Sequence, residues 1–159
     1  MTPQDTPFPN DPDRHALWEM LVPRDIAAFL AADWSMVDDD FAHDRFFGMH
    51  GHFRANPDSW RLAFPDVATY RDEWLRQARD TATERFAEDL GPAMFRATTL
   101  RDIDIAGDRA VLHKKFDGTV ARADAPPVHL NWQTLYFCAR IDGRWKITGF
   151  VGYIPHPLA

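Results

Sequence analysis

The spacing of apolar residues changes along the chain and divides it into a helical first part and a sheet-forming second part. Over roughly the first 90 residues, apolar side chains recur every three or four positions, which is the period of an amphipathic helix. This spacing predicts two short helices between Asp11 and Leu30, separated at Pro23, and a third short helix over residues 35–41. We expect Asp38-Asp39-Asp40 to form the solvated side of that third helix.

A longer amphipathic helix is predicted to begin at Asp66, a residue type that often caps helices. We expect it to run to about Leu90, where Gly91-Pro92 would end it. The segment before it, residues 48–65, is broken by Gly and Pro and predicts a strand edge followed by a long loop. The apolar stripe of the long helix consists of Val67, Tyr70, Trp74 and Ala78.

From Phe95 onward the period becomes two, as in strands with one buried face. Four strand-like runs follow, joined by turns at Ala106-Gly107-Asp108 and Asp142-Gly143 and by a Pro-rich connection between them. Helices first and an antiparallel meander afterwards predict an α+β domain with the N-terminal helices on the concave face of a curved antiparallel sheet. Residues 1–12 are predicted to be a disordered lead, and 13–159 a single domain.

Composition narrows the class of protein. The chain has 159 residues, 45% of them hydrophobic, which suits one domain with a substantial core. Its net charge of −6 is spread along the sequence, which argues against nucleic acid as a partner. The single cysteine, Cys138, lies in an apolar run and fits a reducing setting. With no basic and apolar leader and no long apolar run, we expect a cytoplasmic protein without a membrane partner.

The stretch DFAHDRFFGMHGHF, residues 40–53, holds the densest candidate chemistry. On a strand His50 and His52 would point to the same side, where they could approach a metal ion together. However, Gly51 makes the backbone between them pliable, and no cluster of carboxylates completes a ligand set. We therefore expect no metal site, and we interpret His50 as a candidate for proton transfer near neutral pH.

Two motifs resemble a known family. The first is Ala32-Asp33-Trp34 followed by Phe41-Ala42-His43-Asp44, and the second is Ile141 to Ile147, IDGRWKI, followed by Gly149-Phe150. Together with the order of elements they resemble the nuclear transport factor 2-like superfamily, which includes SnoaL-like polyketide cyclases, ketosteroid isomerases and scytalone dehydratases. The resemblance implies a cystatin-like cone and covers nearly the whole chain. Because these motifs specify fold, they do not fix the reaction.

The catalytic residues of the best-known members are not matched in this sequence. The position of the isomerase base holds Met49, with His50 beside it, and its helix tyrosine falls near Asp25. The dehydratase tyrosine and aspartate correspond to Phe29-Leu30. By position in the resemblance, His50 with Asp44 is the candidate catalytic pair. The residues that we expect to line a ligand pocket are Trp34, Tyr70, Trp74, Trp132, Thr134 and Tyr136.

These features predict a small-molecule pocket protein of the SnoaL-like kind that acts without a cofactor. If it is an enzyme, we expect a lyase, isomerase or cyclase with a hydrophobic substrate. The alternative is a non-catalytic ligand-binding or assembly subunit with the same fold, whose interior would hold no polar group deep in the cone. On the sheet, Leu135 and Phe137 belong to a face of mixed polarity, which predicts a homodimer formed through the outer sheet face.

Overall fold

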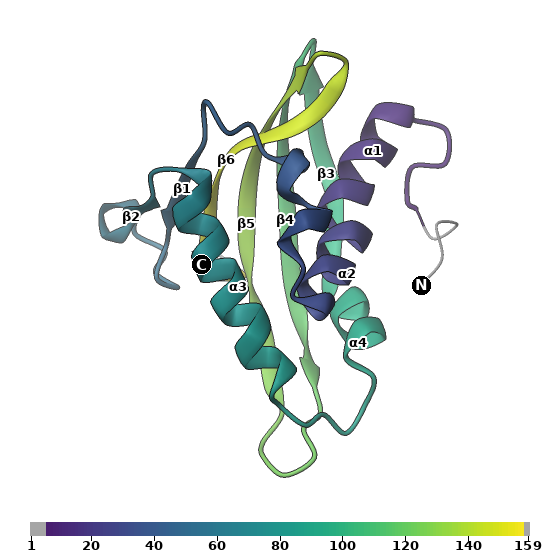
Figure 1. The fold of residues 1–159 in the computed structure, drawn as a ribbon, viewed down its shortest axis with the longest axis vertical. Coiled ribbons are helices and arrows are strands. Elements are labelled where there is room, and N and C mark those ends of the chain that lie inside the picture. Colours follow the sequence, from purple (N-terminus) through teal and green to yellow (C-terminus); the bar gives the residue numbers. More distant parts are fainter. Residues whose placement is uncertain (1–5, 158–159) are drawn as a thin grey trace.

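The structure is a computed structural model that describes residues 6–157 of the chain. Four helices lie across one face of a sheet (Figure 1). They are α1 (Pro12–Leu21), α2 (Pro23–Ala31), α3 (Val67–Ala82) and α4 (Leu90–Ala97). Each of the first three begins beside a Pro or an Asp cap, and Asp66 accepts a hydrogen bond from the Thr69 amide at 2.8 Å.

The sheet has six strands in the order β2-β1-β6-β5-β4-β3. The four long strands form the predicted meander: β3 (Thr98–Ala106), β4 (Arg109–Val120), β5 (Val128–Ile141) and β6 (Arg144–Ile154). Two short strands, β1 (Phe47–His50) and β2 (Arg61–Phe64), form a hairpin at the far edge. The α+β class is as predicted, but the sheet is mixed, because β1 runs parallel to β6.

The predicted long helix is two helices. α3 ends at Ala82, and the chain then forms a short ladder beside the end of β4, in which the Ala87 amide donates to the Ala121 carbonyl at 2.9 Å. Asp89 follows as the N-cap of α4. Gly91-Pro92 therefore lies in the first turn of a helix instead of ending one, a place where Pro is tolerated because the amide there needs no helical partner.

The segment from 34 to 65 also differs from the prediction. The expected third helix is two single turns of 3₁₀ helix, Trp34–Met36 and Asp38–Asp40. The expected long loop is interrupted by β2, which pairs back onto β1. Short apolar runs such as RLAF carry little periodicity, and here the sheet edge decides their conformation.

The predicted disordered lead lies partly outside the described residues, which begin at Thr6. Within the described part, Phe8 packs against the hydrophobic core and Asp11 caps α1 by accepting a hydrogen bond from the Arg14 amide at 3.0 Å. None of the described helices is long and apolar enough to cross a membrane.

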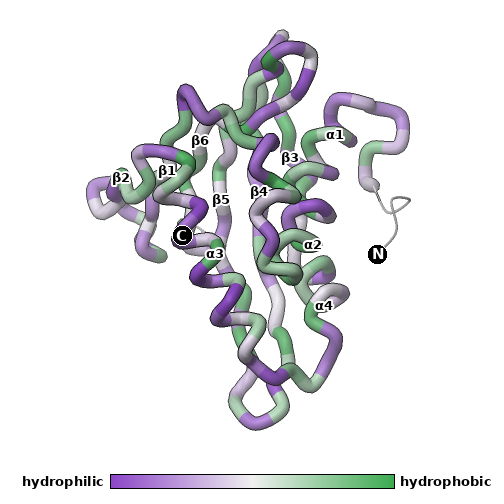
Figure 2. Tube along the Cα trace, in the orientation of Figure 1, coloured by the Kyte–Doolittle hydropathy of each residue, from purple (hydrophilic) through white to green (hydrophobic). Residues whose placement is uncertain are grey.

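The core lies between the helices and the sheet. Hydrophobic and hydrophilic stretches alternate along α3 (Figure 2), and Val67, Trp74 and Ala78 of its predicted stripe are buried. α1 contributes Leu17 and Leu21, which are at most 2% exposed. This packing holds all four helices on the same side of the sheet and leaves the opposite side without helices.

Asp40 is buried, contrary to the expectation for the Asp38-Asp39-Asp40 run. It is 1% exposed and receives two hydrogen bonds of 2.9 Å from the Arg24 guanidinium of α2. Arg144, at the start of β6, donates a third at 2.7 Å. A buried carboxylate is tolerated only when its charge is compensated in this way, so Asp40 joins α2 to the sheet.

Replacing Asp40 should therefore destabilise the fold. We expect Asp40→Ala to lower the free energy of unfolding by about 2–3 kcal/mol, because it removes three charge-assisted hydrogen bonds to partly exposed arginines. Urea unfolding measures the change. Asp39→Ala, at an exposed neighbouring position, is the control and should change it by less than about 0.5 kcal/mol. Equal effects of the two substitutions would contradict this role of Asp40.

Candidate functional site

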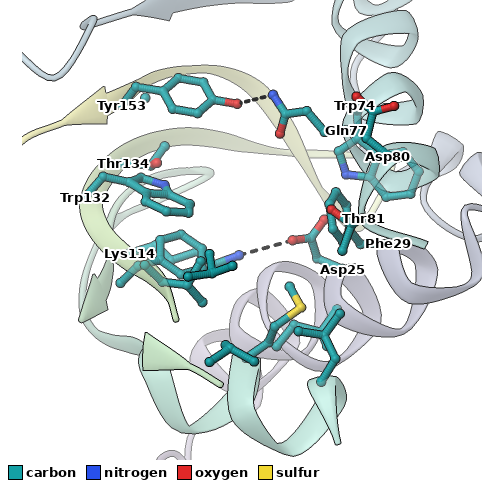
Figure 3. Close-up of a pocket in the computed structure, with 18 of the residues that line it drawn as sticks. Asp25, Phe29, Trp74, Gln77, Asp80, Thr81, Lys114, Trp132, Thr134 and Tyr153 are labelled. Atoms are coloured by element: carbon teal, nitrogen blue, oxygen red, sulfur yellow. Dashed lines mark hydrogen bonds and ion pairs between the residues drawn. The ribbon is translucent and has the colours of Figure 1, made fainter. Parts of the chain in front are cut away.

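A cavity of about 350 Å³ lies between the helices and the long strands. Residues of α2, α3 and α4 form one side of it, and residues of β4, β5 and β6 form the other (Figure 3). Because successive strand residues point to opposite faces, Phe116, Trp132 and Tyr136 face the helices across this space. The helices contribute Phe29 and Trp74, whose rings meet edge to face at 5.6 Å.

The structure brings five of the six predicted pocket residues together on the cavity wall: Tyr70, Trp74, Trp132, Thr134 and Tyr136. Trp34, the sixth, lies behind Trp74, with ring centroids 5.2 Å apart, and donates its indole N–H to Asp38 at 2.6 Å. It therefore supports the wall from the core without belonging to it.

An ion pair between a buried lysine and a partly exposed aspartate joins the two sides of the cavity, and the sequence-based prediction did not contain it. Lys114 of β4 is 1% exposed, and its Nζ lies 3.2 Å from Oδ2 of Asp25 in the first turn of α2. The same Nζ donates a hydrogen bond to the backbone carbonyl of Leu21. Figure 3 shows the two side chains pointing toward each other, one from the sheet and one from a helix.

The sequence contained a signal that Lys114 faces the helices. It lies between Leu112 and Phe116 at a spacing of two, so it belongs to the face of β4 that points at the helices. A lysine on an apolar face requires a partner, and only tertiary structure identifies that partner as Asp25. The N-terminal end of α2 also favours the carboxylate of Asp25 there, through the partial positive charge of the helix end.

Three tyrosines add hydroxyl groups to the cavity. Burial raises the pKa of Tyr70 and Tyr136 well above 10, and the charge of Asp25 raises both further. The Tyr153 hydroxyl accepts a hydrogen bond from Gln77 of α3 at 2.8 Å. Within residues 6–157, neither Tyr70 nor Tyr136 has a hydrogen-bond partner for its hydroxyl, so both are free to bind a ligand or water.

The predicted catalytic pair, His50 and Asp44, is not brought together at the cavity. His50 ends β1 beside the cavity residue Tyr153, with the two rings stacked at 4.1 Å, and its Nδ1 accepts the His52 amide at 3.0 Å. Asp44 is exposed and pairs with its neighbour Arg45 at 2.9 Å. Within the described ranges, no cluster of three His, Cys, Asp or Glu residues could hold a metal ion.

Comparison with known proteins identifies the fold. No protein-family model matches the sequence, and no curated protein matches it. An NTF2-like protein of unknown function from Pseudomonas putida superposes with a TM-score of 0.58 at 16% identity, covering 91% of this chain and 87% of that one. One from Shewanella baltica gives a TM-score of 0.56 at 14% identity, covering 89% and 92%.

A third structure, from Novosphingobium aromaticivorans, is an NTF2-like protein with a cystatin-like fold. It matches with a TM-score of 0.53 at 11% identity, covering 89% of this chain and 80% of that one. The chain therefore has the nuclear transport factor 2-like, cystatin-like fold. At these identities the comparison establishes architecture, and the activity has to be argued from the cavity.

The environment of His50 predicts its titration. Burial lowers the pKa of His50 below 6.5, and the adjacent His52 lowers it further, against a smaller opposing effect of Glu73. Because the folded protein binds this proton less readily than the unfolded chain, stability should be complete above pH 6.5 and fall as the pH drops through that value. NMR titration of the His50 ring should give a midpoint below 6.5.

Urea unfolding at about pH 7.5 and about pH 5.5 provides the second measurement. The loss of stability on acidification should be smaller in His50→Gln than in the wild type. His129→Gln, at an exposed position of β5, is the matched control and should leave the loss unchanged. A midpoint at or above 6.5 would contradict the predicted shift.

Proposed function

We propose that the protein binds a hydrophobic small molecule in the cavity and converts it without a cofactor, as a lyase, isomerase or cyclase. The observation that carries this proposal is the cavity itself, an aromatic-walled space of about 350 Å³ in which a few polar groups converge. Its volume is within the range of ligand-binding pockets, about 300–1,000 Å³. Lys114, Asp25 and the tyrosine hydroxyls supply the polar contacts.

The shape of the walls favours a ligand that contains a flat ring. The ring centroids of Phe116 and Trp132 lie 4.6 Å apart on adjacent strands, and Trp74 of α3 lies across the cavity from Trp132 (Figure 3). Aromatic side chains bind planar apolar groups through stacked and edge-to-face contacts. Thr134, buried between these rings and Tyr136, adds a hydroxyl on the same wall.

The polar interior favours an enzyme over the non-catalytic alternative. A binding or assembly subunit was expected to have no polar group deep in the cone, whereas the Lys114–Asp25 pair lies between the helices and the sheet. Retaining a buried lysine at a cavity wall is costly, and such groups cluster at functional sites. We place proton transfer at this pair, and we assign His50 to the support of Tyr153 on the wall.

Filling the cavity should prevent binding. Leu130 of β5 lines the cavity, and Leu130→Trp should weaken binding of the neutral fluorescent probe N-phenyl-1-naphthylamine by about fivefold or more, as an overpacking cost of about 1–3 kcal/mol implies. Probe fluorescence measures the affinity. Leu62→Trp on β2, where the side chain is 59% exposed, makes the same exchange outside the cavity and should bind like the wild type.

Failure of the wild type to bind this probe would contradict the proposed function. Circular dichroism of Leu130→Trp would verify that the variant remains folded, so that weaker binding reports the filled cavity.

We also propose that the protein forms a homodimer through the outer sheet face. The outer-face patch consists of Phe47 and Met49 of β1, Leu135 and Phe137 of β5 and Val111 of β4, which alternate along their strands with residues that face the helices. Phe47 and Val111 are 38% and 43% exposed, and the rings of Phe47 and Phe137 lie 5.8 Å apart. A contiguous apolar patch on a sheet face is typical of a protein interface.

A charge in this patch should separate the dimer. Val111→Glu places two buried carboxylates in a two-fold interface and should weaken association by roughly 2 kcal/mol or more. Light scattering at micromolar concentration should give a dimer for the wild type and a monomer for the variant. Met36→Glu, at an exposed apolar residue outside the sheet, is the control and should stay dimeric. A monomeric wild type would contradict the proposal.

A further inference from the structure

The lysines of this chain are few, and one of them is placed differently from the others. The sequence contains three, Lys114, Lys115 and Lys146, beside fifteen arginines. Arginine makes most of the ion pairs, including both that hold Asp40. Lys114 is 1% exposed, which is unusual for a lysine, and it lies on the cavity wall. An arginine would anchor a charge there equally well, whereas lysine alone can become a nucleophile at neutral pH.

We propose that Lys114 forms a Schiff base with an aldehyde or ketone group of the molecule bound in the cavity, and that Asp25 is the base that frees the amine. This inference rests on the proposed function, because it requires a ligand in the cavity. It adds the chemical class of that ligand, an apolar or aromatic carbonyl compound. It also assigns a covalent role to a residue outside the predicted site.

The surroundings of Lys114 suit an amine that reacts. The Nζ atom lies over the Phe116 ring, 5.1 Å from its centroid, and 6.0 Å from that of Tyr136. Its hydrogen-bond acceptors are the Leu21 carbonyl and Asp25. Because an ammonium has three N–H donors, one remains for the cavity. That third position is where an amine whose proton has passed to Asp25 would meet a bound carbonyl group.

Asp25 provides the proton acceptor that the reaction needs. Its Oδ2 is 3.2 Å from Nζ, so a proton can pass from the ammonium to the carboxylate. The transfer converts an ion pair into a neutral amine and a neutral acid, and the total charge of the pair is unchanged. Because the pair has no net charge, it offers no excess positive charge to an anionic ligand, and this favours a neutral carbonyl compound.

The covalent step balances with these groups alone. The free amine of Lys114 attacks the carbonyl carbon, and the C=O π electrons move to oxygen, which takes the proton held by Asp25. The addition product carries two protons on its positively charged nitrogen. One of them passes to the departing hydroxide, the electron pair that it leaves forms C=N, and the other stays on nitrogen. The products are one protonated imine, beside the Asp25 carboxylate, and one water molecule, and no oxidant or reductant is consumed. A protonated imine stabilises a carbanion on the adjacent carbon, which suits the proposed lyase or isomerase chemistry.

Reductive trapping tests the proposal directly. The full-length protein is incubated with 2-naphthaldehyde and sodium cyanoborohydride at neutral pH, and the label is located by peptide mass mapping. We expect one naphthylmethyl group per chain, on Lys114. Lys115, the next residue on β4, pairs with Asp102 on the other side of the sheet and, with Lys146, serves as a control within the same molecule. Label spread over Lys115 and Lys146 with none on Lys114 would overturn the proposal.

Matched variants distinguish the role of the Lys114 amine from the role of its positive charge. Lys114→Arg keeps a cation beside Asp25 but cannot form an imine, so it should lose the label completely, whereas Lys115→Arg should keep it. Asp25→Asn removes the proton acceptor and should slow labelling of Lys114, while Asp39→Asn, at an exposed carboxylate outside the cavity, should not. Circular dichroism establishes that each variant is folded. If Asp25→Asn is not, the double variant Asp25→Asn with Lys114→Met removes both charges and should be folded and unlabelled.

Binding of N-phenyl-1-naphthylamine, measured on the same samples, distinguishes the two levels of the proposal. If the wild type binds this probe but Lys114 is not labelled, the Schiff base is overturned and the proposed function stands. If the wild type binds no probe, the proposed function fails, and the covalent role fails with it. Labelling of Lys114 that is unchanged in Asp25→Asn would overturn the assignment of Asp25 as the base.

Discussion

The pairing of β4 with β5 determines what the cavity contains. The two strands pair along the whole of β4, from Arg109 to Val120, and side chains alternate between the two faces at every step. A shift of β4 by one residue in this register would turn Lys114 and Phe116 away from the helices, while Trp132 of β5 would keep facing them. The backbone pairing of β4 with β5 therefore decides which side chains line the cavity.

α2 is positioned on this sheet by two ionic contacts from adjacent residues. Arg24 reaches Asp40 on one side, and Asp25 reaches Lys114 on the other. The first contact compensates a carboxylate that is buried in the core, and the second lies on the cavity wall. The helix end that holds the candidate base is therefore fixed by a structural ion pair one residue away, which gives Asp25 a defined position relative to the sheet.

The sequence predicted those parts of the fold that depend on periodicity. The stripe of α3 and the four long strands follow from the spacing of Trp74 and its neighbours and from the turns at Gly107 and Gly143. The predicted end of α3 was wrong, because the ladder of Ala87 with the Ala121 segment overrides helix propensity. Asp40 was placed on the surface because its two arginines are 16 and 104 residues away.

In the cavity, too, the features that follow from sequence periodicity were predicted and those that depend on long-range contacts were not. Its aromatic wall could be predicted from alternation along β5, whereas the Lys114–Asp25 pair depends on a contact across 89 residues that no local pattern contains. His50 was selected by its position in a resemblance, and the structure places it beside Tyr153, next to the wall. The catalytic role of His50 and Asp44 stays a prediction from the resemblance, and the proposed function assigns proton transfer to Lys114 and Asp25 instead.

The attachment of Lys114 to one strand has a stereochemical consequence. Its amine approaches the cavity from the sheet side, and Asp25 approaches from the helix side. A planar molecule held between these two layers presents one face to the amine and the other to the helices. The two faces of a prochiral carbonyl are then inequivalent before any bond forms. Because the Lys114 amine is on the sheet and not on a helix, its attack from the sheet side would determine the handedness of the product.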